Sequence, residues 1–377
     1  MTSLSSAGRR RGLRRLLALA IALLPVASTP GAEGTYVSYP EVVAGQGLAF
    51  PADYGSHPEF RTEWWYVTGW LQTAAGEPMG FQVTFFRTRP DAPPANPSAF
   101  APRQLIIAHA ALSDPSLGRL RHAQRIARAG LGLAGAATGD TDVTLDDWRL
   151  TRSDRAYRTR VSGEGFAFDL VLEPTQAPLP NGVDGYSRKG RAPASASFYY
   201  SIPQLVVTGQ VQREGRSEAV RGSAWLDHEW STALLDVDAA GWDWVGLNLD
   251  DGGALMAFRM RDQQGESLWA GASLRDADGA VTSFGPREVE FVPGRRWRSL
   301  RTAIEYPVTW TVRAGPVTVE LQPLLDDQEA DSRATTGAVY WEGAVQALAQ
   351  GQAVGRGYLE LTGYGAPLRL PGDEPDR

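Results

Sequence analysis

The stretch EWWYVTGWL (63–71) is followed, after a turn that contains Gly76, by MGFQVTFFR (79–87). Aromatic and β-branched residues dominate both segments, and such residues are typical of strands that lie half-buried in a sheet. Two strand-like segments joined by a short glycine-containing turn predict a β-hairpin. We therefore work outward from this hairpin toward an all-β fold.

Further strand-like segments follow along the chain. They occupy residues 104–113, 166–173, 198–202, 204–212 and 222–230. The 41 glycines and 25 prolines separate these segments, which indicates many turns between short strands. Helical periodicity is scarce, and its best example, residues 119–136, contains three glycines. The sequence predicts an all-β protein with few short helices, and its 377 residues suggest two domains.

The two halves of the chain resemble each other. The segment TGQVQ (208–212), followed by an Arg-Gly pair, recurs as EGAVQ (342–346), again followed by Arg-Gly. We interpret this as duplication of one all-β unit, with a boundary near residues 234–241. The predicted domains are 33–236 and 237–377. Two loops, 90–103 and 174–197, are rich in proline or glycine; we interpret them as solvated connections, which would be lids if they lay at a barrel mouth.

Comparison of the halves locates the candidate chemistry. Superposing Gly222 on Gly357 aligns Asp227, His228 and Glu229 with Thr362, Gly363 and Tyr364, so only the first half has ionisable groups there. Strand side chains alternate, so Trp225, Asp227 and Glu229 share one face and His228 lies on the other. A carboxyl on an aromatic wall loses hydration, which raises its pKa and lets it donate a proton near neutral pH. The alternative is that Asp227 and Glu229 form salt bridges with arginines at a barrel rim.

A second dense cluster is HPEFRTEWWY (57–66). Trp64, Trp65 and Tyr66 are candidate ligand-binding residues, and the alternative is a plug of tryptophan and arginine that closes a barrel floor. His109 is a further candidate ligand-binding residue, or a buried histidine whose hydrogen bonds are satisfied by the core.

Several classes of chemistry are excluded by missing residues. There is no cysteine, so disulfides, thiolate metal sites, cysteine nucleophiles and a lipid-anchored N-terminus are excluded. The G-x-S-x-G, H-E-x-x-H, P-loop and dinucleotide-binding motifs are also missing. Asp227, His228 and Glu229 are consecutive in a strand and point to opposite faces, so they are poorly placed to bind one ion. We expect no metal and no cofactor.

The N-terminus reads as a targeting segment. Five arginines within residues 9–15 precede an apolar run at 16–24 and small residues at 26–28, which is typical of a signal peptide. We expect residues 1–32 to direct export by the Sec or Tat route to the periplasm or the extracellular space; an uncleaved amphipathic anchor is the alternative. The chain has a formal net charge of −6, and loss of the five arginines makes it more acidic, which argues against nucleic acid as a partner.

Long motifs carry a family resemblance. They are EWWYVTGWL (63–71), MGFQVTFFR (79–87), AHAALSD (108–114), GSAWLDHEW (222–230), GWDWVGLNLDDG (241–252), YWEGAV (340–345) and GYLELTGY (357–364). Together they resemble the AttH/carotenoid 1,2-hydratase family. The resemblance implies two lipocalin-like antiparallel β-barrel domains in tandem. The family includes predicted secreted hydrolases, hydratases of acyclic carotenoids and fungal pericyclases. In its hydratases the acid lies in a Tyr-x-Asp-His-x-Trp motif; here Asp227, His228 and Trp230 match, and Trp225 replaces the tyrosine.

The resemblance implies a cofactor-independent hydro-lyase with an isoprenoid or lipid-like ligand in its barrel. Asp227 would protonate a terminal alkene, aromatic faces of Trp225, Trp64, Trp65 or Tyr66 would stabilise the carbocation, and His228 or His109 would position water. One alternative is a non-catalytic lipid carrier that serves a membrane transport system. Another is a carbohydrate-active β-sandwich with tryptophan platforms and Asp227 and Glu229 as its acid pair.

Overall fold

The computed structural model describes residues 37–91, 98 and 101–369. Apart from the 3₁₀-helix η1 (Ala52–Tyr54), the regular structure of this part of the chain is β-strand. Across the same residues, no helix has the length and apolar character needed to cross a membrane. The signal segment 1–32 and part of the loop 90–103 lie outside the described residues, so the predictions made for them stay predictions.

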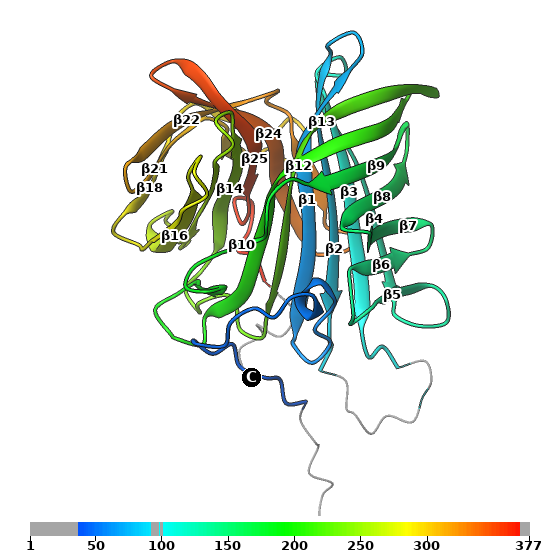
Figure 1. Cartoon of the computed structure of the whole chain (residues 1–377), viewed down its shortest axis with the longest axis vertical. Helices are drawn as coiled ribbons and strands as arrows, with labels where there is room; N and C mark the ends of the chain where they lie inside the picture. Colours follow the sequence, from blue (N-terminus) through cyan, green and yellow to red (C-terminus); the bar gives the residue numbers. More distant parts are fainter. Residues whose placement is uncertain (1–36, 92–97, 99–100, 370–377) are drawn as a thin grey trace, which may run out of the picture. The chain divides into compact units, whose positions relative to one another are not determined.

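Sheet A contains the hairpin from which the sequence analysis started. Its strands pair antiparallel in the order β4-β3-β2-β1-β13-β12-β9-β8-β7-β6-β5, with β10 and β11 joined to β12. Their bounds are β1 (Thr62–Thr73), β2 (Pro78–Thr88), β3 (Leu105–Asp114), β4 (Arg119–Arg128), β5 (Ala134–Ala136), β6 (Asp142–Leu145), β7 (Trp148–Ser153), β8 (Ala156–Gly163), β9 (Phe166–Pro174), β10 (Leu179–Pro180), β11 (Tyr186–Arg188), β12 (Ala196–Arg213) and β13 (Arg216–Ser231). The sheet curls until β4 approaches β6 and β8, which makes it a nearly closed barrel (Figure 1).

Sheet B repeats this arrangement in the second half of the chain. Its antiparallel order is β17-β16-β15-β14-β25-β24-β22-β21-β18, with β23 joined to β24, and β19 and β20 form a separate pair. The bounds are β14 (Gly241–Leu249), β15 (Ala254–Arg261), β16 (Ser267–Arg275), β17 (Val281–Phe284), β18 (Val289–Pro293), β19 (Arg296–Arg298), β20 (Glu305–Pro307), β21 (Trp310–Ala314), β22 (Val317–Pro323), β23 (Glu329–Ser332), β24 (Ala338–Ala349) and β25 (Gln352–Leu361). In both sheets the first strand pairs with the last. The predicted all-β class is confirmed; the domain limits 33–236 and 237–377 stay predictions.

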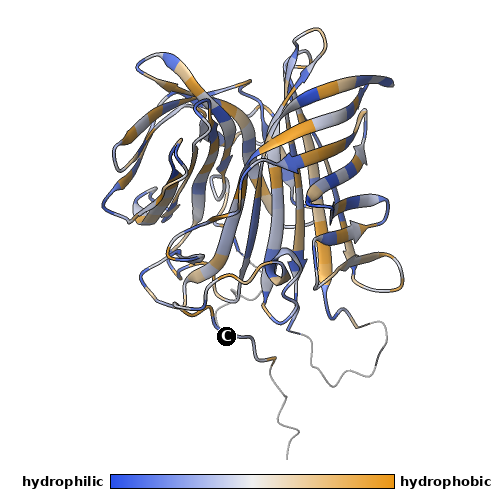
Figure 2. Cartoon of the chain, in the orientation of Figure 1, coloured by the Kyte–Doolittle hydropathy of each residue, from blue (hydrophilic) through white to orange (hydrophobic). Residues whose placement is uncertain are grey.

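Each sheet encloses its own apolar core. In sheet A, alternate residues of β1 such as Trp65, Val67 and Leu71 join the buried cluster inside the curl. In sheet B, Val245 and Leu247 of β14 do the same. Figure 2 shows the resulting alternation of apolar and polar residues along the strands. Alternation lets one face of each strand fill a barrel and leaves the other face for further packing.

A third apolar cluster lies where the outer faces of the two sheets meet. It includes Trp70 and Trp225 of sheet A and Met256 and Tyr358 of sheet B. Trp70 Nε1 donates a hydrogen bond to the carbonyl oxygen of Gly357, at 2.9 Å. Close approach needs a small residue at Gly80, because a Cβ placed there would lie 2.6 Å from Cβ of Ala344. The sheets therefore touch tightly at this end of their interface.

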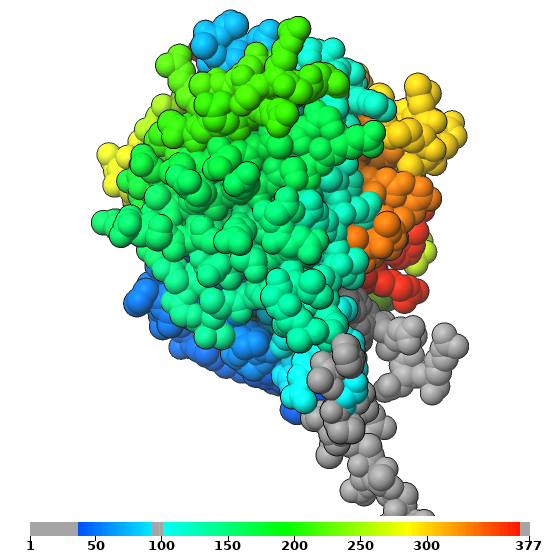
Figure 3. Space-filling model, turned by 90° about the vertical axis from the view of Figure 1, so that its right-hand side faces the viewer, coloured from blue at the N-terminus to red at the C-terminus, as the bar shows by residue number. Residues whose placement is uncertain are grey.

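The weak helical period at residues 119–136 does not correspond to a helix in the structure. These residues form β4 and β5, and β4 pairs along its whole length with β3. The backbone N–H of Leu120 also donates to the carbonyl oxygen of Asp327, near β23 of sheet B. Figure 3 shows the contact between this part of sheet A and the orange segment of sheet B. Backbone hydrogen bonds to a neighbouring strand thus outweigh the local helical period.

Two glycines that the repeat superposes have the same surroundings. A Cβ at Gly222 would lie 1.9 Å from the carbonyl oxygen of Trp70, and one at Gly357 would lie 1.9 Å from that of Gly246. In each sheet this glycine lets the last strand pass close to the first. The structural equivalence supports the superposition made from sequence.

Replacing Gly357 by alanine is expected to destabilise the fold. The added methyl group clashes with backbone, so β25 must move away from β14, and overpacking of this kind costs about 1–3 kcal/mol. Urea denaturation followed by tryptophan fluorescence measures the change. Gly135→Ala is the matched control because a Cβ at Gly135 meets no atom within 4 Å. Equal stability of the two variants would contradict the prediction.

Candidate functional site

A cavity of about 490 Å³ lies between the sheets, next to their tight contact. Its walls come from β1, β2, β12 and β13 of sheet A and from β14, β15, β24 and β25 of sheet B. The expectation of a ligand inside a barrel is corrected, because both barrel interiors hold apolar cores. The cavity that the predicted acids line is therefore the wedge between the outer faces of the two sheets.

Strand alternation places the predicted residues in this wedge. Trp64 and Tyr66 of β1 line the cavity, and so do Asp227 and Glu229 of β13. Tyr66 is the register partner of Asp227, and Trp64 is the partner of Glu229. The aromatic and acidic residues thus form two adjacent rows across the wall of sheet A.

Asp227 is buried, and both of its carboxyl oxygens accept hydrogen bonds. Ser201 Oγ and Trp225 Nε1 donate to Oδ1, each at 2.6 Å, and the Tyr199 hydroxyl donates to Oδ2 at 2.8 Å. Tyr199 accepts in turn from Trp244 Nε1 of sheet B at 3.0 Å. Burial raises the pKa of Asp227 to about 7 and outweighs the three donors, which favour the charged form. Trp225, a predicted ligand-binding residue, is instead the group that holds the acid.

Glu229 has a different environment. Lys189 Nζ lies 3.0 Å from its Oε1, and Ser197 Oγ donates to the same oxygen. Lys189 also stands 4.1 Å from the ring centroid of Phe258, a cavity residue of sheet B. The alternative of a salt bridge to arginine is wrong for Glu229, which pairs with a buried lysine, while its predicted ligand-binding role stays a prediction.

Lys189 belongs to the loop 174–197 and lines the cavity. Arg275 of β16 donates to the carbonyl oxygens of Ala177 and Pro178, each at 3.0 Å, and Ser283 Oγ donates to that of Gly182 at 2.7 Å. The loop starts in sheet A, and these three hydrogen bonds attach it to sheet B. Its Lys189 lines the cavity, and the interpretation of this loop as a lid stays a prediction.

Two of the acids that line the cavity were not predicted from the sequence. Glu342 of β24 and Glu360 of β25 are register partners and both line the cavity. Burial raises the pKa of Glu342 to about 8, and burial followed by the Glu342 charge raises that of Glu360 well above its usual value. The repeat could have identified one of them. Superposing Gly222 on Gly357 aligns Glu360 with Trp225, which shares a strand face with Asp227.

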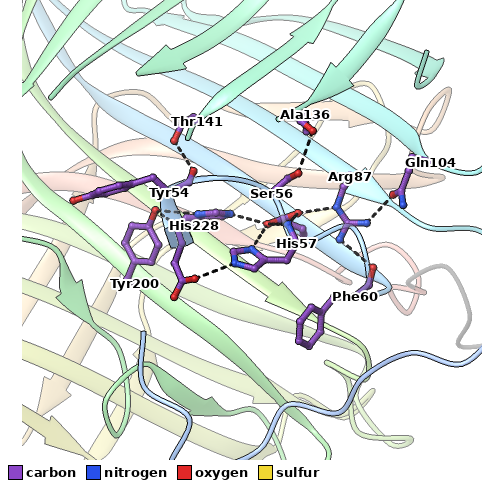
Figure 4. Close-up of polar contacts among 12 residues, drawn as sticks. Tyr54, Ser56, His57, Phe60, Arg87, Gln104, Ala136, Thr141, Tyr200 and His228 are labelled. Carbon is purple, nitrogen blue, oxygen red and sulfur yellow. Dashed lines mark hydrogen bonds and ion pairs between the residues drawn. The ribbon is translucent and has the colours of Figure 1, made fainter. Parts of the chain in front are cut away.

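His228 and Trp65 point away from the cavity, into barrel A, so neither reaches a ligand held beside Asp227. His228 Nδ1 lies 3.0 Å from the Tyr200 hydroxyl (Figure 4). Its Nε2 lies 2.9 Å from Glu63 Oε1, and its ring stacks on Trp65. This corrects the predicted catalytic role of His228 and ligand-binding role of Trp65. The physical reason is the alternation of side chains along β13 and β1.

The buried Glu63 contacts His57, Arg87 and His228, three residues that Figure 4 labels. It accepts from His57 Nδ1 at 2.8 Å and from Arg87 Nε at 2.7 Å, in addition to its contact with His228. These partners outweigh burial and hold the pKa of Glu63 far below its usual value. Burial lowers the pKa of His57, but hydrogen bonds to Asp53 and Glu63 outweigh it and raise the value to about 9. Of the cluster 57–66, His57, Glu63 and Trp65 thus contact His228 inside barrel A, while Trp64 and Tyr66 line the cavity.

Among the described residues, this network contains three possible metal ligands that lie close together. Ligand atoms of His57, Glu63 and His228 lie within 4.8 Å of one another. Arg87 already balances the carboxylate, and the separations of 2.8 and 2.9 Å to Glu63 are hydrogen-bond lengths. These contacts form a buried hydrogen-bond network around Glu63.

His109 lies outside the cavity, which corrects its predicted ligand-binding role. Its Nε2 is 2.9 Å from Thr335 Oγ1 of sheet B, and Thr335 itself lines the cavity. Its ring packs 5.6 Å from that of His122. Burial lowers the pKa of His109 to about 3 and that of His122 to about 4. His109 thus joins the sheets as a satisfied core histidine.

The lowered pKa values of His109 and His122 predict that the folded protein loses stability in acid. Both stay neutral in the folded protein and bind protons in the unfolded chain below pH about 6.5, so stability falls as pH falls from about 6.5 toward 4. Each contributes a slope of about 1.4 kcal/mol per pH unit in that range. We expect His109→Gln to lose less stability than the parent between pH 7 and 5, as measured by urea denaturation. Identical losses would contradict this assignment.

Comparisons with known proteins agree with this architecture. The AttH-like family model matches residues 41–364. A crystal structure of a protein from Nitrosomonas europaea that carries the AttH name is 53% identical, covers 86% of this chain and 99% of its own, and has a TM-score of 0.81. Kievitone hydratase from Nectria haematococca shares the fold at 14% identity, with 87% of this chain and 96% of its own covered and a TM-score of 0.66. None of the curated proteins matches. The chain belongs to the AttH-like family.

Proposed function

We propose that the protein is a cofactor-independent hydratase that binds an apolar, isoprenoid-like molecule between its sheets and adds water to a terminal C=C bond. The observation that carries this proposal is Asp227, a buried carboxyl with a pKa of about 7 on the aromatic wall of a cavity. A carboxyl of this kind holds its proton at a pH at which ordinary aspartates have lost theirs.

Proton transfer begins at Asp227 Oδ2. When this oxygen carries the proton, it donates to the Tyr199 hydroxyl, which still accepts from Trp244 and turns its own proton toward the cavity. The alkene takes a proton at its less substituted carbon, its π bond breaks, and a tertiary carbocation forms. The proton on the alkene comes from the Tyr199 hydroxyl. Asp227 replaces it by giving its own proton to the Tyr199 oxygen, and becomes a carboxylate.

The cavity walls suit the cation. The rings of Trp64, Tyr66, Trp242 and Trp244 line the space, and aromatic faces attract positive charge. Water then adds its oxygen to the cationic carbon and gives a proton to the Asp227 carboxylate, which restores the acid. The net change is alkene plus water to tertiary alcohol. His228 and His109 have no part in this step because they lie outside the cavity.

Family and fold support the proposal at a coarser level. The AttH-like family model covers most of the chain, and kievitone hydratase, a hydratase by name, has the same fold. Residues 1–32 support export to the periplasm or the extracellular space as a further proposal. Cell fractionation with N-terminal sequencing tests it, and an uncleaved cytoplasmic chain would contradict it.

The hydration test uses acyclic isoprenoids in isotopically labelled water. We expect mass spectrometry to find the label in a tertiary alcohol that forms only with the protein. Binding without incorporation would contradict a hydratase and favour a carrier that serves a membrane transport system. Mass spectrometry of co-purifying molecules identifies the ligand class: an isoprenoid fits the hydratase, a phospholipid the carrier and a glycan the carbohydrate-active alternative.

A further inference from the structure

Two acids of sheet B face the cavity and take no part in the hydration step. Glu342 and Glu360 are directly opposite each other on β24 and β25, and Trp244 of β14 is the next residue in the same row. All three line the cavity. Carboxylates directly opposite on neighbouring strands repel each other. The pair is therefore costly unless a proton or another positive charge lies between its members.

The local charges leave this pair without a cation from the protein. Burial dominates the raised pKa of Glu342, and no basic side chain stabilises either carboxylate among the described residues. Without a bound cation the pair holds protons at neutral pH.

The groups that face the pair are acids, phenols and aromatic rings. Asp227 and Glu229 approach from β13, and both raise the pKa of Glu360. Lys189 is already paired with Glu229, and Arg369 lines the exposed rim. The described part of the cavity thus has four carboxyls and one buried cation. An excess of acid beside aromatic rings favours a positively charged ligand.

Tyr66 is a second, independent sign of a ligand at this place. Its side chain lines the cavity, is only 4% exposed, and its hydroxyl has no hydrogen-bond partner among the described residues. After burial, the charges that most raise its pKa are those of Glu342 and Glu360. A buried hydroxyl without a partner is unfavourable, so a ligand donor between Tyr66 and the acid pair would complete its hydrogen bonding.

We propose that Glu342, Glu360 and Tyr66 form the cation-binding end of the cavity, which takes an apolar molecule that carries a protonated amine. The ammonium N–H groups donate to the two carboxyls and to the Tyr66 oxygen, and the apolar body lies against Trp64 and Trp244. The amine displaces a proton from the acid pair, so binding releases a proton to solvent. This inference rests on the proposed function only in taking the cavity as the ligand site.

Calorimetric titration with geranylamine and geraniol tests the inference, because these probes share one carbon skeleton and differ in charge. At pH 7.5 we expect geranylamine to bind at least about tenfold more tightly. Titration in two buffers of different ionisation enthalpy should show release of about one proton per amine and none with the alcohol. Glu342→Gln and Glu360→Gln should each remove most of the preference for the amine over the alcohol. Glu320→Gln, at an exposed position on β22, is the matched control.

The outcomes separate this inference from the hydratase. Equal affinity for the two probes, or an unchanged preference in both glutamine variants, overturns the cation site and leaves the hydratase standing. Preferential amine binding with proton release supports the cation site even where no alkene is hydrated. Failure of both probes to bind overturns the cation site and the cavity as a site for isoprenoid-like molecules.

Discussion

Asp227→Asn is expected to lower the hydration rate by about 10²- to 10⁴-fold, the usual contribution of a general acid. Asparagine has the same shape and still accepts hydrogen bonds from Ser201 and Trp225, but it has no acidic proton to pass to Tyr199. Ligand affinity should change little because the cavity keeps its walls. Initial rates of tertiary alcohol formation under saturating substrate measure the effect.

Asp142→Asn is the control for this change. Asp142 is an exposed aspartate of β6, outside the cavity, and its replacement should leave the rate unchanged. In the proposed reaction Asp227 acts in its protonated form and its pKa is about 7, so the hydration rate of the parent protein should also fall as pH rises through about 7. An unaltered rate in Asp227→Asn, or a rate that rises across this pH range, would show that another group supplies the proton.

Glu63→Gln is expected to cost about 3–5 kcal/mol of folding free energy. Glu63 is fully buried and balances Arg87, which is itself 1% exposed, while also accepting hydrogen bonds from His57. The amide leaves the guanidinium without a counter-charge inside barrel A. The loss should appear in urea or thermal denaturation as a lower midpoint with native-like spectra below the transition.

Two further variants show whether the buried charge is the cause. Glu63→Gln combined with Arg87→Met should recover part of the lost stability, because no unpaired ion remains in the core. Glu290→Gln removes the acid of an exposed pair with Arg313 and should cost less than about 1 kcal/mol. A double variant no more stable than Glu63→Gln would assign the loss to packing instead.

The fold was predictable because its signals are local and repeated. A period of two along EWWYVTGWL, glycine-containing turns and the recurrence of TGQVQ as EGAVQ already indicate two antiparallel all-β units. The helical pattern at 119–136 was misleading, since the pairing of β4 with β3 depends on a strand distant from its own local sequence.

The candidate site was predictable in part. Alternation along β13 correctly put Asp227 and Glu229 on one face and His228 on the other. It did not say which face lies inside the barrel, and here both faces are buried, one in a core and one against the other sheet. His228 and Trp65 were therefore assigned to the wrong environment, and His109 proved to be a core contact.

By itself, the sequence determined the strand pattern, the recurrence of TGQVQ as EGAVQ and the alternation that puts Asp227 and Glu229 on one strand face, because these depend on neighbours along the chain. The tertiary structure decided where the cavity lies, that Lys189 neutralises Glu229, and that Glu342 and Glu360 face Asp227 from the other sheet. Burial raises the pKa of Asp227, Glu342 and Glu360, and this burial arises only when two sheets distant in sequence come together.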